Sequence, residues 1–272
     1  MIRAQPPGQP SGQPSGQSSA KNPAPPAGRG LEGRCALITG SARRLGAAMA
    51  RALHAAGANV VIHHLRSADE AAALARELNA ARPASAATLQ ADLLDTAGLP
   101  RLVEAAVATF GCLDILVNNA STFYPTPMGV ITEAHFDDLI GTNLKAPLFL
   151  AQAAAPQLRR RHGLVLNMVD IHGMKPLRRY PVYSTAKAGL IMLTRVLARE
   201  LAPEVRVNGI APGPVLWPAD VDSDMQAEII DKTLLKRSGS PADIAQAALY
   251  FALHAPYVTG QILAVDGGRS QT

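Results

Sequence analysis

The sequence has few cysteines, few aromatic side chains and no long apolar run. Cys35 and Cys112 are the only cysteines among 272 residues, and aromatic residues make up 4% of the chain. Two cysteines are too few for a disulfide framework, and we expect both to be reduced residues in a cytoplasmic protein. No apolar run approaches the roughly 20 residues that span a bilayer. The first residues also lack the apolar core of a secretory signal, so we expect neither export nor a membrane span.

Acidic residues are the minority charge. The chain has 26 Lys and Arg against 21 Asp and Glu, which leaves a formal net charge of +5. The arginines are scattered along the chain and form no basic stripe, so we expect phosphate-bearing small molecules rather than nucleic acid as partners. With 48% hydrophobic residues, the chain is long enough to bury one sizeable core.

Residues 1–30 consist mainly of Pro, Gly, Gln and Ser, with hardly an apolar side chain larger than alanine. Such a segment buries too little apolar surface to offset the entropy lost on ordering. We therefore predict a disordered low-complexity extension over residues 1–30 and a folded domain over residues 31–272.

From Leu31 onward, short apolar runs alternate with amphipathic stretches. The predicted strands lie in RCALITG, NVVIHHL, AATLQADL, LDILVNNAS, GLVLNMVDI, VRVNGIAPG and QILAVDGG. Helical patterns separate them, and uninterrupted apolar strands are typical of a parallel sheet covered on both faces. The pattern predicts an α/β protein with a single doubly wound Rossmann-type domain and a seven-stranded parallel sheet flanked by helices.

Three local features are predicted within this alternation. Ser67 and Glu70 have the spacing of a capping box at the start of the second helix. Residues 132–161 are predicted to form one long helical segment with a kink near Pro147. Residues 214–240 form an insert between the sixth strand and the next helix, and we expect this insert to act as a substrate loop.

Tyr183 and Lys187 begin the helical run YSTAKAGLIMLTRVLARELA. A separation of four residues puts both side chains on one helix face, and a nearby lysine cation favours the tyrosine phenolate. We therefore expect a lowered pKa for Tyr183, which suits a general acid near neutral pH. Asp170 ends the apolar run LVLNMVD, and we expect it to meet Tyr183 where strand and helix join. Alone, a Tyr-x-x-x-Lys pair arises often by chance.

Ligands of doubly wound sheets bind beyond the carboxyl ends of the strands. The first strand is followed by Gly40, Arg44, Leu45 and Gly46, a turn that leads directly into a helix whose N–H groups can hold phosphate. The second strand ends near Arg66 and Ser67 with no carboxylate, which favours NADPH over NADH. His63 and His64 are neighbours in a strand and point to opposite faces, so we expect no shared metal ion.

The later strand ends carry further polar candidates. Asp92 either accepts from an adenine amino group or caps the next helix, and the sequence leaves both interpretations open. The remaining candidates are Asn119, Ala120, Ser121 and Phe123 after the fourth strand, Asn143 within the long helical segment, and Pro212 and Gly213 after the sixth strand.

Five motifs belong together: Thr39-Gly40 to Gly46, Asn118-Asn119-Ala120, Asn143, Tyr183-x-x-x-Lys187 and Pro212-Gly213. With them, the chain resembles the short-chain dehydrogenase/reductase family over residues 31–270. The resemblance implies that Tyr183 donates a proton, that Lys187 holds the nicotinamide ribose of NADPH, and that Asn143 supports a relay water. Two departures stand out: Arg44 replaces a usual glycine, and Asp170 replaces a usual serine that polarises a carbonyl group.

The same two departures occur here together with Ser121, Phe123 and the strings NNASTFYPTP and His64-x-Arg66-Ser67. In this combination, the chain resembles the pteridine reductase subfamily. The resemblance implies that a pterin stacks between the nicotinamide and Phe123, with Arg44 and Ser121 contacting pterin and cofactor phosphates and with Asp170 and Tyr183 acting in protonation. It also implies a homotetramer. Two alternatives remain: a reductase of ketoacyl, sugar or steroid carbonyl groups, and a non-catalytic NADP-binding regulatory protein.

Overall fold

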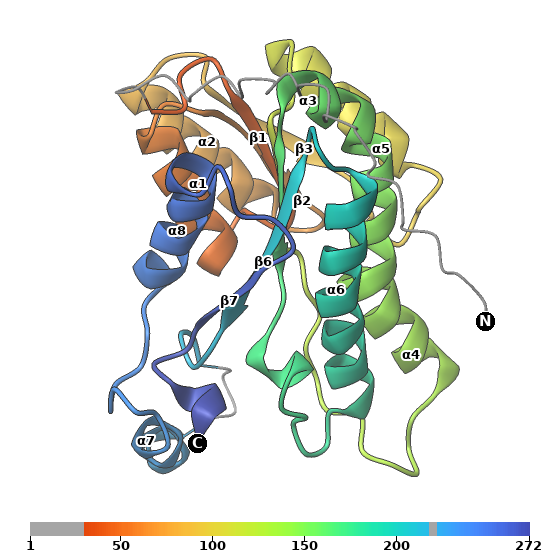
Figure 1. Ribbon diagram of the computed structural model, residues 1–272, viewed down its shortest axis with the longest axis vertical. Coiled ribbons are helices and arrows are strands. Elements are labelled where there is room, and N and C mark those ends of the chain that lie inside the picture. Colours follow the sequence, from red (N-terminus) through yellow and green to blue (C-terminus); the bar gives the residue numbers. More distant parts are fainter. Residues whose placement is uncertain (1–29, 218–221) are drawn as a thin grey trace, which may run out of the picture.

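The computed structural model describes residues 30–217 and 222–272. Residues 1–29 of the predicted disordered extension, which was placed at residues 1–30, therefore lie outside the described residues. All seven predicted strands form and make one parallel sheet in the order β3-β2-β1-β4-β5-β6-β7 (Figure 1). Their bounds are β1 (Cys35–Ile38), β2 (Asn59–His64), β3 (Ala86–Gln90), β4 (Ile115–Asn118), β5 (Leu164–Met168), β6 (Arg206–Pro212) and β7 (Ile262–Val265). The predicted α/β fold class is confirmed.

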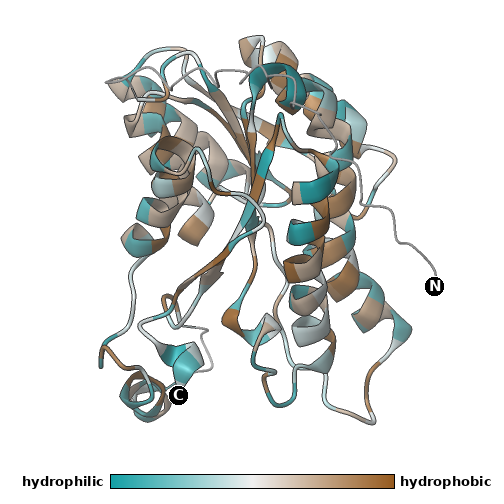
Figure 2. Ribbon diagram, viewed as in Figure 1, coloured by the Kyte–Doolittle hydropathy of each residue, from teal (hydrophilic) through white to brown (hydrophobic). Residues whose placement is uncertain are grey.

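Helices cover both faces of the sheet (Figure 1). One layer contains α1 (Arg44–Ala55), α2 (Ala68–Ala81) and α8 (Pro241–Leu249), and the other contains α3 (Leu99–Phe110), α5 (Ala146–Arg161) and α6 (Pro181–Glu200). Alternate residues of β1 enter different cores: Ala36 and Ile38 join the first layer, whereas Cys35 and Leu37 join the second. Both sides of each central strand are buried, which is why the strand sequences are uniformly apolar. Figure 2 shows the hydrophobic colour concentrated on the sheet and on the helix faces beside it.

The predicted helix over residues 132–161 is divided into three parts. After α4 (Glu133–Ile140), a π-helical turn η1 (Gly141–Lys145) leads into α5. Asn143 lies in this turn and its Nδ2 donates to the Leu139 carbonyl at 2.9 Å, so the polar side chain replaces regular helix bonding. Pro147 lies in the first turn of α5, where its missing N–H costs little. The irregularity therefore precedes the proline.

Two further local predictions change in the structure. Ser67 precedes α2 but its side chain makes no capping bond, and Glu70 instead pairs with Arg43 at 3.3 Å. The predicted capping box is therefore wrong. The insert contains a short helix, α7 (Ser223–Asp231), with no buried residue, and Asp222 caps it. Short helical turns η2 (Ile171–Gly173), η3 (Tyr250–His254) and η4 (Arg269–Gln271) complete the described elements.

In the ranges that the structure describes, no helix combines the length and apolar character needed to cross a membrane.

Candidate active site

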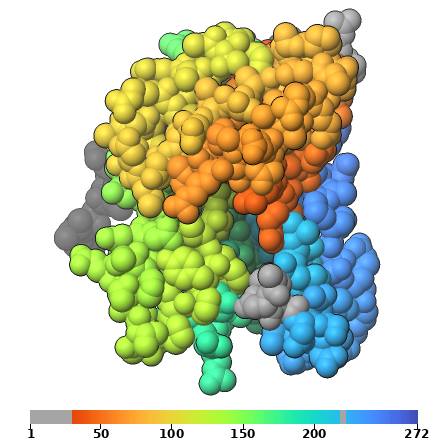
Figure 3. All heavy atoms as spheres, turned by 180° about the vertical axis from the view of Figure 1, so that it is seen from behind, coloured from red at the N-terminus to blue at the C-terminus, as the bar shows by residue number. Residues whose placement is uncertain are grey.

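The strand order reverses direction between β1 and β4. In doubly wound sheets, ligands bind at such a switch point, beyond the carboxyl ends of the strands. The space-filling view shows a hollow on this side, between the orange surface of the early strands and the green surface that follows β4 (Figure 3). Most of the candidate residues lie on the loops around it.

The turn after β1 is fixed by a histidine. Gly40 has a φ of 59°, and its N–H donates to His63 Nδ1 at 3.1 Å. The other ring nitrogen, Nε2, lies 3.1 Å from the Ala91 carbonyl, so the ring accepts at one end and donates at the other. Burial lowers the pKa of His63 to about 4, which keeps the imidazole neutral. The sequence did not predict that His63 fixes this turn, because its partner Gly40 is 23 residues away in the chain.

The start of α1 suits an anionic ligand. A Cβ atom on Gly46 would lie 2.6 Å from both Asn119 Nδ2 and Ser41 Cα, so only glycine allows this close approach. No side chain caps the N-terminus of α1, and its first turn contains no acidic residue. The free backbone N–H groups and the helix dipole therefore favour a phosphate group at this point.

The end of β2 carries positive charge, which would attract a phosphate group. His64 is buried, and its Nδ1 has no hydrogen-bond partner within residues 30–217 and 222–272. Arg66 is exposed and forms no ion pair within the same ranges. Ser67 follows it and is half-buried. An unsatisfied buried nitrogen, a free guanidinium and a hydroxyl fit the 2′-phosphate and ribose of NADPH.

The Asp92 carboxylate is already used in a hydrogen bond within its own loop. It is exposed, and its Oδ1 accepts from the Leu94 N–H at 2.9 Å, which tightens the loop between β3 and α3. This bond lies within the loop and does not cap α3, which begins at Leu99, so the capping interpretation is wrong for Asp92. Adenine recognition by Asp92 stays a prediction.

Thr39 joins the ends of β1 and β4. Its Oγ1 accepts from the backbone N–H groups of Asn119 at 2.9 Å and Ala120 at 3.0 Å. Asn119 Nδ2 also donates to the Thr39 carbonyl at 2.8 Å. These bonds fix both predicted cofactor residues, Asn119 and Ala120, beside the turn that carries Gly40. A Cβ atom added at Gly40 would lie 3.0 Å from Ala120 Cα.

Asp170 and Tyr183 meet as predicted. Asp170 lies two residues beyond β5, and Tyr183 lies in the first turn of α6. The Tyr183 hydroxyl donates to Asp170 Oδ2 at 2.7 Å, and Asp170 Oδ1 accepts from the His172 N–H at 2.8 Å. Gly173 permits the chain to pass close to α6, because a Cβ there would lie 2.8 Å from the Lys187 carbonyl carbon.

The expected lowering of the Tyr183 pKa is wrong for this structure. Burial raises the pKa of Tyr183 well above its ordinary value, and the charge and hydrogen bond of Asp170 raise it further. Lys187 is fully buried, and its Nζ lies 5.6 Å from the Tyr183 ring centroid and donates to the Met168 carbonyl at 2.8 Å. Burial lowers the pKa of Lys187 to about 8. Tyr183 is therefore held in its protonated form.

Ser121 connects Asn143 with the tyrosine. Its Oγ donates to Asn143 Oδ1 at 2.7 Å, and the nearby Ser121 hydroxyl acts to lower the pKa of Tyr183. Asn143 Nδ2 donates to the Thr122 carbonyl at 3.0 Å. The π-helical turn thus places Asn143 against the loop that follows β4, where the predicted Ser121 also lies.

Phe123, Tyr180 and Tyr183 form an aromatic group beside these polar residues. Phe123 stacks on Tyr180 with ring centroids 4.6 Å apart, and it meets Tyr183 edge to face at 4.7 Å. Tyr180 was not among the sequence candidates. Its position three residues before Tyr183 offered a signal, because residues i and i+3 share a helix face, but the stacking partner comes from a distant loop.

Arg44 takes an unusual backbone conformation at the start of α1. Its φ is 55°, in the left-handed region that favours glycine, and its side chain is exposed. Among the described residues, no hydrogen bond or ring contact joins Arg44 to Ser121 or Phe123. Pro212 and Gly213 lie at the end of β6, where the Gly213 N–H donates to the Val265 carbonyl at 3.0 Å. Their ligand-binding roles stay predictions.

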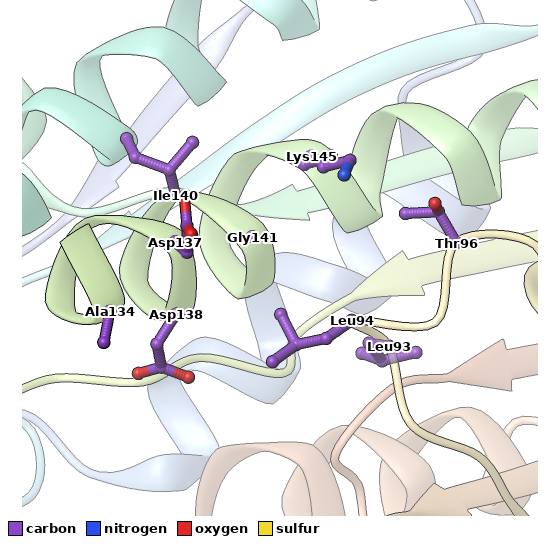
Figure 4. Close-up of a pocket in the computed structure, with 9 residues that line it drawn as sticks. All are labelled: Leu93, Leu94, Thr96, Ala134, Asp137, Asp138, Ile140, Gly141 and Lys145. Atoms are coloured by element: carbon purple, nitrogen blue, oxygen red, sulfur yellow. The ribbon is translucent and has the colours of Figure 1, made fainter.

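A separate cavity of about 420 Å³ lies between α4 and the loop after β3 (Figure 4). Leu93, Leu94 and Thr96 line one side, and Asp137 and Lys145 lie on the other. None of the predicted site residues lines this cavity.

The comparisons with known proteins agree with this geometry. A family model described as enoyl-(acyl carrier protein) reductase matches residues 40–270. Pteridine reductase 1 of Leishmania tarentolae is 38% identical, with 87% of this chain and 96% of that protein covered. A 3-oxoacyl-(acyl-carrier-protein) reductase of Staphylococcus epidermidis is 34% identical, with 86% and 98% covered. The crystal structure of a blue fluorescent protein from a metagenomic library, in complex with NADPH, matches with a TM-score of 0.83 and 33% identity, covering 89% and 99%.

The chain belongs to the short-chain dehydrogenase/reductase family. It is an NAD(P)-dependent oxidoreductase of Rossmann fold, and the predicted resemblance to pteridine reductases is confirmed by its similarity to pteridine reductase 1.

Proposed function

We propose that this protein is an NADPH-dependent reductase of pterins, which converts dihydrobiopterin, dihydromonapterin or dihydrofolate to the tetrahydro form. The observation that carries the proposal is the 2.7 Å hydrogen bond from the Tyr183 hydroxyl to Asp170. A carboxylate is a poor partner for a carbonyl oxygen, because negative charge grows on that oxygen during reduction. It suits a ring nitrogen that gains a proton during reduction of the adjacent carbon.

The residues divide the chemistry between them. Bound NADPH supplies the hydride. The Tyr183 hydroxyl is the proposed proton donor, and burial and Asp170 keep it protonated by raising its pKa. Asp170 orients that hydroxyl and balances the positive charge on the protonated ring. Lys187 would hold the nicotinamide ribose, and Ser121, which donates to Asn143, lies beside the tyrosine.

Phe123 is proposed to supply the aromatic face for the pterin. It is 40% exposed and stacks on Tyr180, so part of its ring is accessible and a neighbouring ring supports it. Offset stacking of a heteroaromatic ring contributes roughly 0.5–1.5 kcal/mol beyond its burial. Arg44 and Ser121 are proposed to contact the pterin and the cofactor phosphates.

The preference for NADPH is proposed from the end of β2. Arg66, Ser67 and the unsatisfied Nδ1 of His64 favour a 2′-phosphate, whereas a carboxylate would repel one. Gly40, Gly46 and the open N-terminus of α1 would hold the pyrophosphate, and Asn119, Ala120, Pro212 and Gly213 would line the remainder of the cofactor site.

The test follows NADPH oxidation by absorbance with 7,8-dihydrobiopterin and dihydrofolate, in the parent and in Asp170→Ser. Asp170→Ser supplies the hydroxyl that the family's carbonyl reductases carry, so we expect loss of pterin turnover by about 10²-fold or more. Asp138→Ser, which removes a carboxylate bonded to Tyr124, is the matched control. Absence of pterin turnover in the parent would refute the proposal.

A reductase of carbonyl substrates is the second candidate, because the acyl-carrier-protein reductase is nearly as similar in sequence as pteridine reductase 1. Turnover of a ketoacyl substrate without pterin turnover would favour it. A non-catalytic NADP-binding protein would bind NADPH and consume it with neither substrate.

We also propose a homotetramer in the cytoplasm. The exposed apolar side chains Leu148 on α5 and Met192 and Val196 on α6 provide a face for other copies of the chain. A gel-filtration mass near that of one chain would contradict this assembly.

A further inference from the structure

The segment between η2 and α6 carries positive charge beside the aromatic group. Lys175, Arg178 and Arg179 lie between the catalytic Asp170 and Tyr183, and residues 171–182 contain no acidic side chain. Both arginines are exposed. The segment projects from the molecule between the light-green surface after β4 and the blue surface that includes α7 (Figure 3).

The two arginines are held at the edge of the aromatic group. Tyr180, which directly follows Arg179, stacks on Phe123. The Arg179 carbonyl accepts from the Thr126 N–H at 2.7 Å, which ties this turn to the loop that carries Phe123. The Leu177 N–H donates to Ser184 Oγ at 3.2 Å and ties the same turn to α6. The arginines therefore lie beside a ring that is itself in contact with Tyr183.

Neither arginine is used for an internal ion pair. Within the described ranges, Arg178 and Arg179 have no acidic partner, whereas Arg43 pairs with Glu70 and Arg51 with Glu77. On α7, across the opening, Glu228 is bonded to Lys232. Among residues 30–217 and 222–272, no acidic side chain forms an ion pair with Arg178 or Arg179 beside Tyr180.

Arg179 also occupies a costly backbone conformation. Its φ is 71°, where a side chain costs about 1–2 kcal/mol and glycine costs little. Such strain is commonly retained at ligand-binding sites. Strain, free charge and attachment to both Phe123 and α6 occur together at this turn.

We propose that Arg178 and Arg179 bind an anionic group at the far end of the substrate, so that the enzyme prefers pterins whose side chain ends in carboxylate or phosphate. This inference rests on the proposed pterin reduction. The ring lies at Phe123, Asp170 and Tyr183, and the side chain leaves the pocket past Tyr180 towards the two guanidinium groups, which bind carboxylate and phosphate through paired N–H donors.

The test compares three substrates that share the dihydropterin ring: 7,8-dihydrobiopterin with a neutral side chain, 7,8-dihydrofolate with two carboxylates, and 7,8-dihydroneopterin monophosphate. In the Arg178→Gln/Arg179→Gln double variant, we expect kcat/KM for at least one anionic substrate to fall about tenfold, mainly through KM. We expect a change below about twofold for dihydrobiopterin. The substrate that loses more identifies carboxylate or phosphate as the preferred group.

Two controls separate charge from folding. Arg178→Lys/Arg179→Lys keeps the charge and should retain most of the preference, and Arg76→Gln removes an exposed charge on α2 and should leave all three substrates unaffected. Added salt should raise KM for the anionic substrates only. Equal losses for neutral and anionic substrates, or no loss for any, would overturn the role of the arginines while leaving pterin reduction intact. No turnover of any pterin by the parent would overturn both proposals.

Discussion

The ends of β1 and β2 present backbone N–H groups and a free cation, whereas the ends of β4 and β5 present side chains already hydrogen-bonded to one another. At the ends of β1 and β2, the start of α1 has no side-chain capping bond and leaves backbone donors unsatisfied, and Arg66 has no ion pair within the described residues. At the ends of β4 and β5, Asp170 holds Tyr183 and Ser121 holds Asn143.

The difference follows from what each half has to do. In the proposed function, a cofactor phosphate would accept from the backbone N–H groups at the ends of β1 and β2. The ends of β4 and β5 would hold the proposed proton donor in place, and the buried side-chain bonds would provide this preorganisation. Variants of the second half should therefore affect turnover, and variants of the first half should affect cofactor choice.

The largest effect is expected for Tyr183→Phe, which removes the proton donor and leaves the ring. We expect turnover to fall by about 10²–10⁴-fold while NADPH binding, measured by fluorescence titration, stays nearly intact. Tyr124→Phe is the matched control, because it removes a hydroxyl bonded to Asp138 outside the catalytic group. Normal activity of Tyr183→Phe would exclude Tyr183 from the chemistry.

Low pH should destabilise the folded chain through His63, which fixes the turn after β1. Its pKa is lowered from 6.5 to about 4 in the folded chain, so below pH 6.5 the unfolded chain binds the proton first. The free energy of unfolding should fall as the pH decreases from 6.5 to 4, by about 3 kcal/mol from this residue. Urea unfolding at pH 7 and pH 4.5 measures the loss. His63→Asn should show a smaller pH dependence, and equal pH dependence in both proteins would contradict this assignment.

Arg66→Asp should change cofactor selectivity without changing the catalytic half. A carboxylate at this position repels the 2′-phosphate, so we expect kcat/KM for NADPH to fall roughly 10–100-fold relative to NADH. Arg76→Asp on α2 makes the same charge change on a remote exposed helix and serves as the control. An unchanged NADPH-to-NADH ratio would mean that other residues recognise the phosphate.

The smallest effect is expected for Arg44→Gly, which relieves a positive φ in the cofactor half. Ala84 has the same φ of 55° but lies outside the site, so Ala84→Gly is a direct comparison. Both variants should gain about 0.5–1 kcal/mol of stability in urea unfolding, because strain relief slightly exceeds the added entropy of glycine. Only Arg44→Gly should raise KM for NADPH or pterin. Unchanged kinetics would mean that Arg44 contacts neither ligand.

The fold could be predicted from local pattern alone. Apolar strands such as Leu164–Met168 alternate with amphipathic helices, and burial of both sheet faces leaves that pattern in the sequence. Glycines at positions 40 and 46 and the spacing of Tyr183 and Lys187 are equally local, since the turn and the helix face fix their geometry. The four-residue spacing of Tyr183 and Lys187 therefore pointed to α6 as the helix of the candidate active site.

Other features depended on residues that meet only after folding. The bond from Gly40 to His63, the stacking of Phe123 on Tyr180, and the π-helical turn at Asn143 all join segments that are separate in sequence or depend on packing. The pKa of Tyr183 was predicted in the wrong direction because spacing revealed Lys187 but neither the depth of burial nor the closer contact with Asp170. The sequence by itself determined the parallel sheet, the alternation of strands and helices along the chain, and the helix that carries Tyr183 and Lys187. Only the tertiary structure decided the protonation state of the site, because desolvation and distance are set by the neighbours that folding brings together.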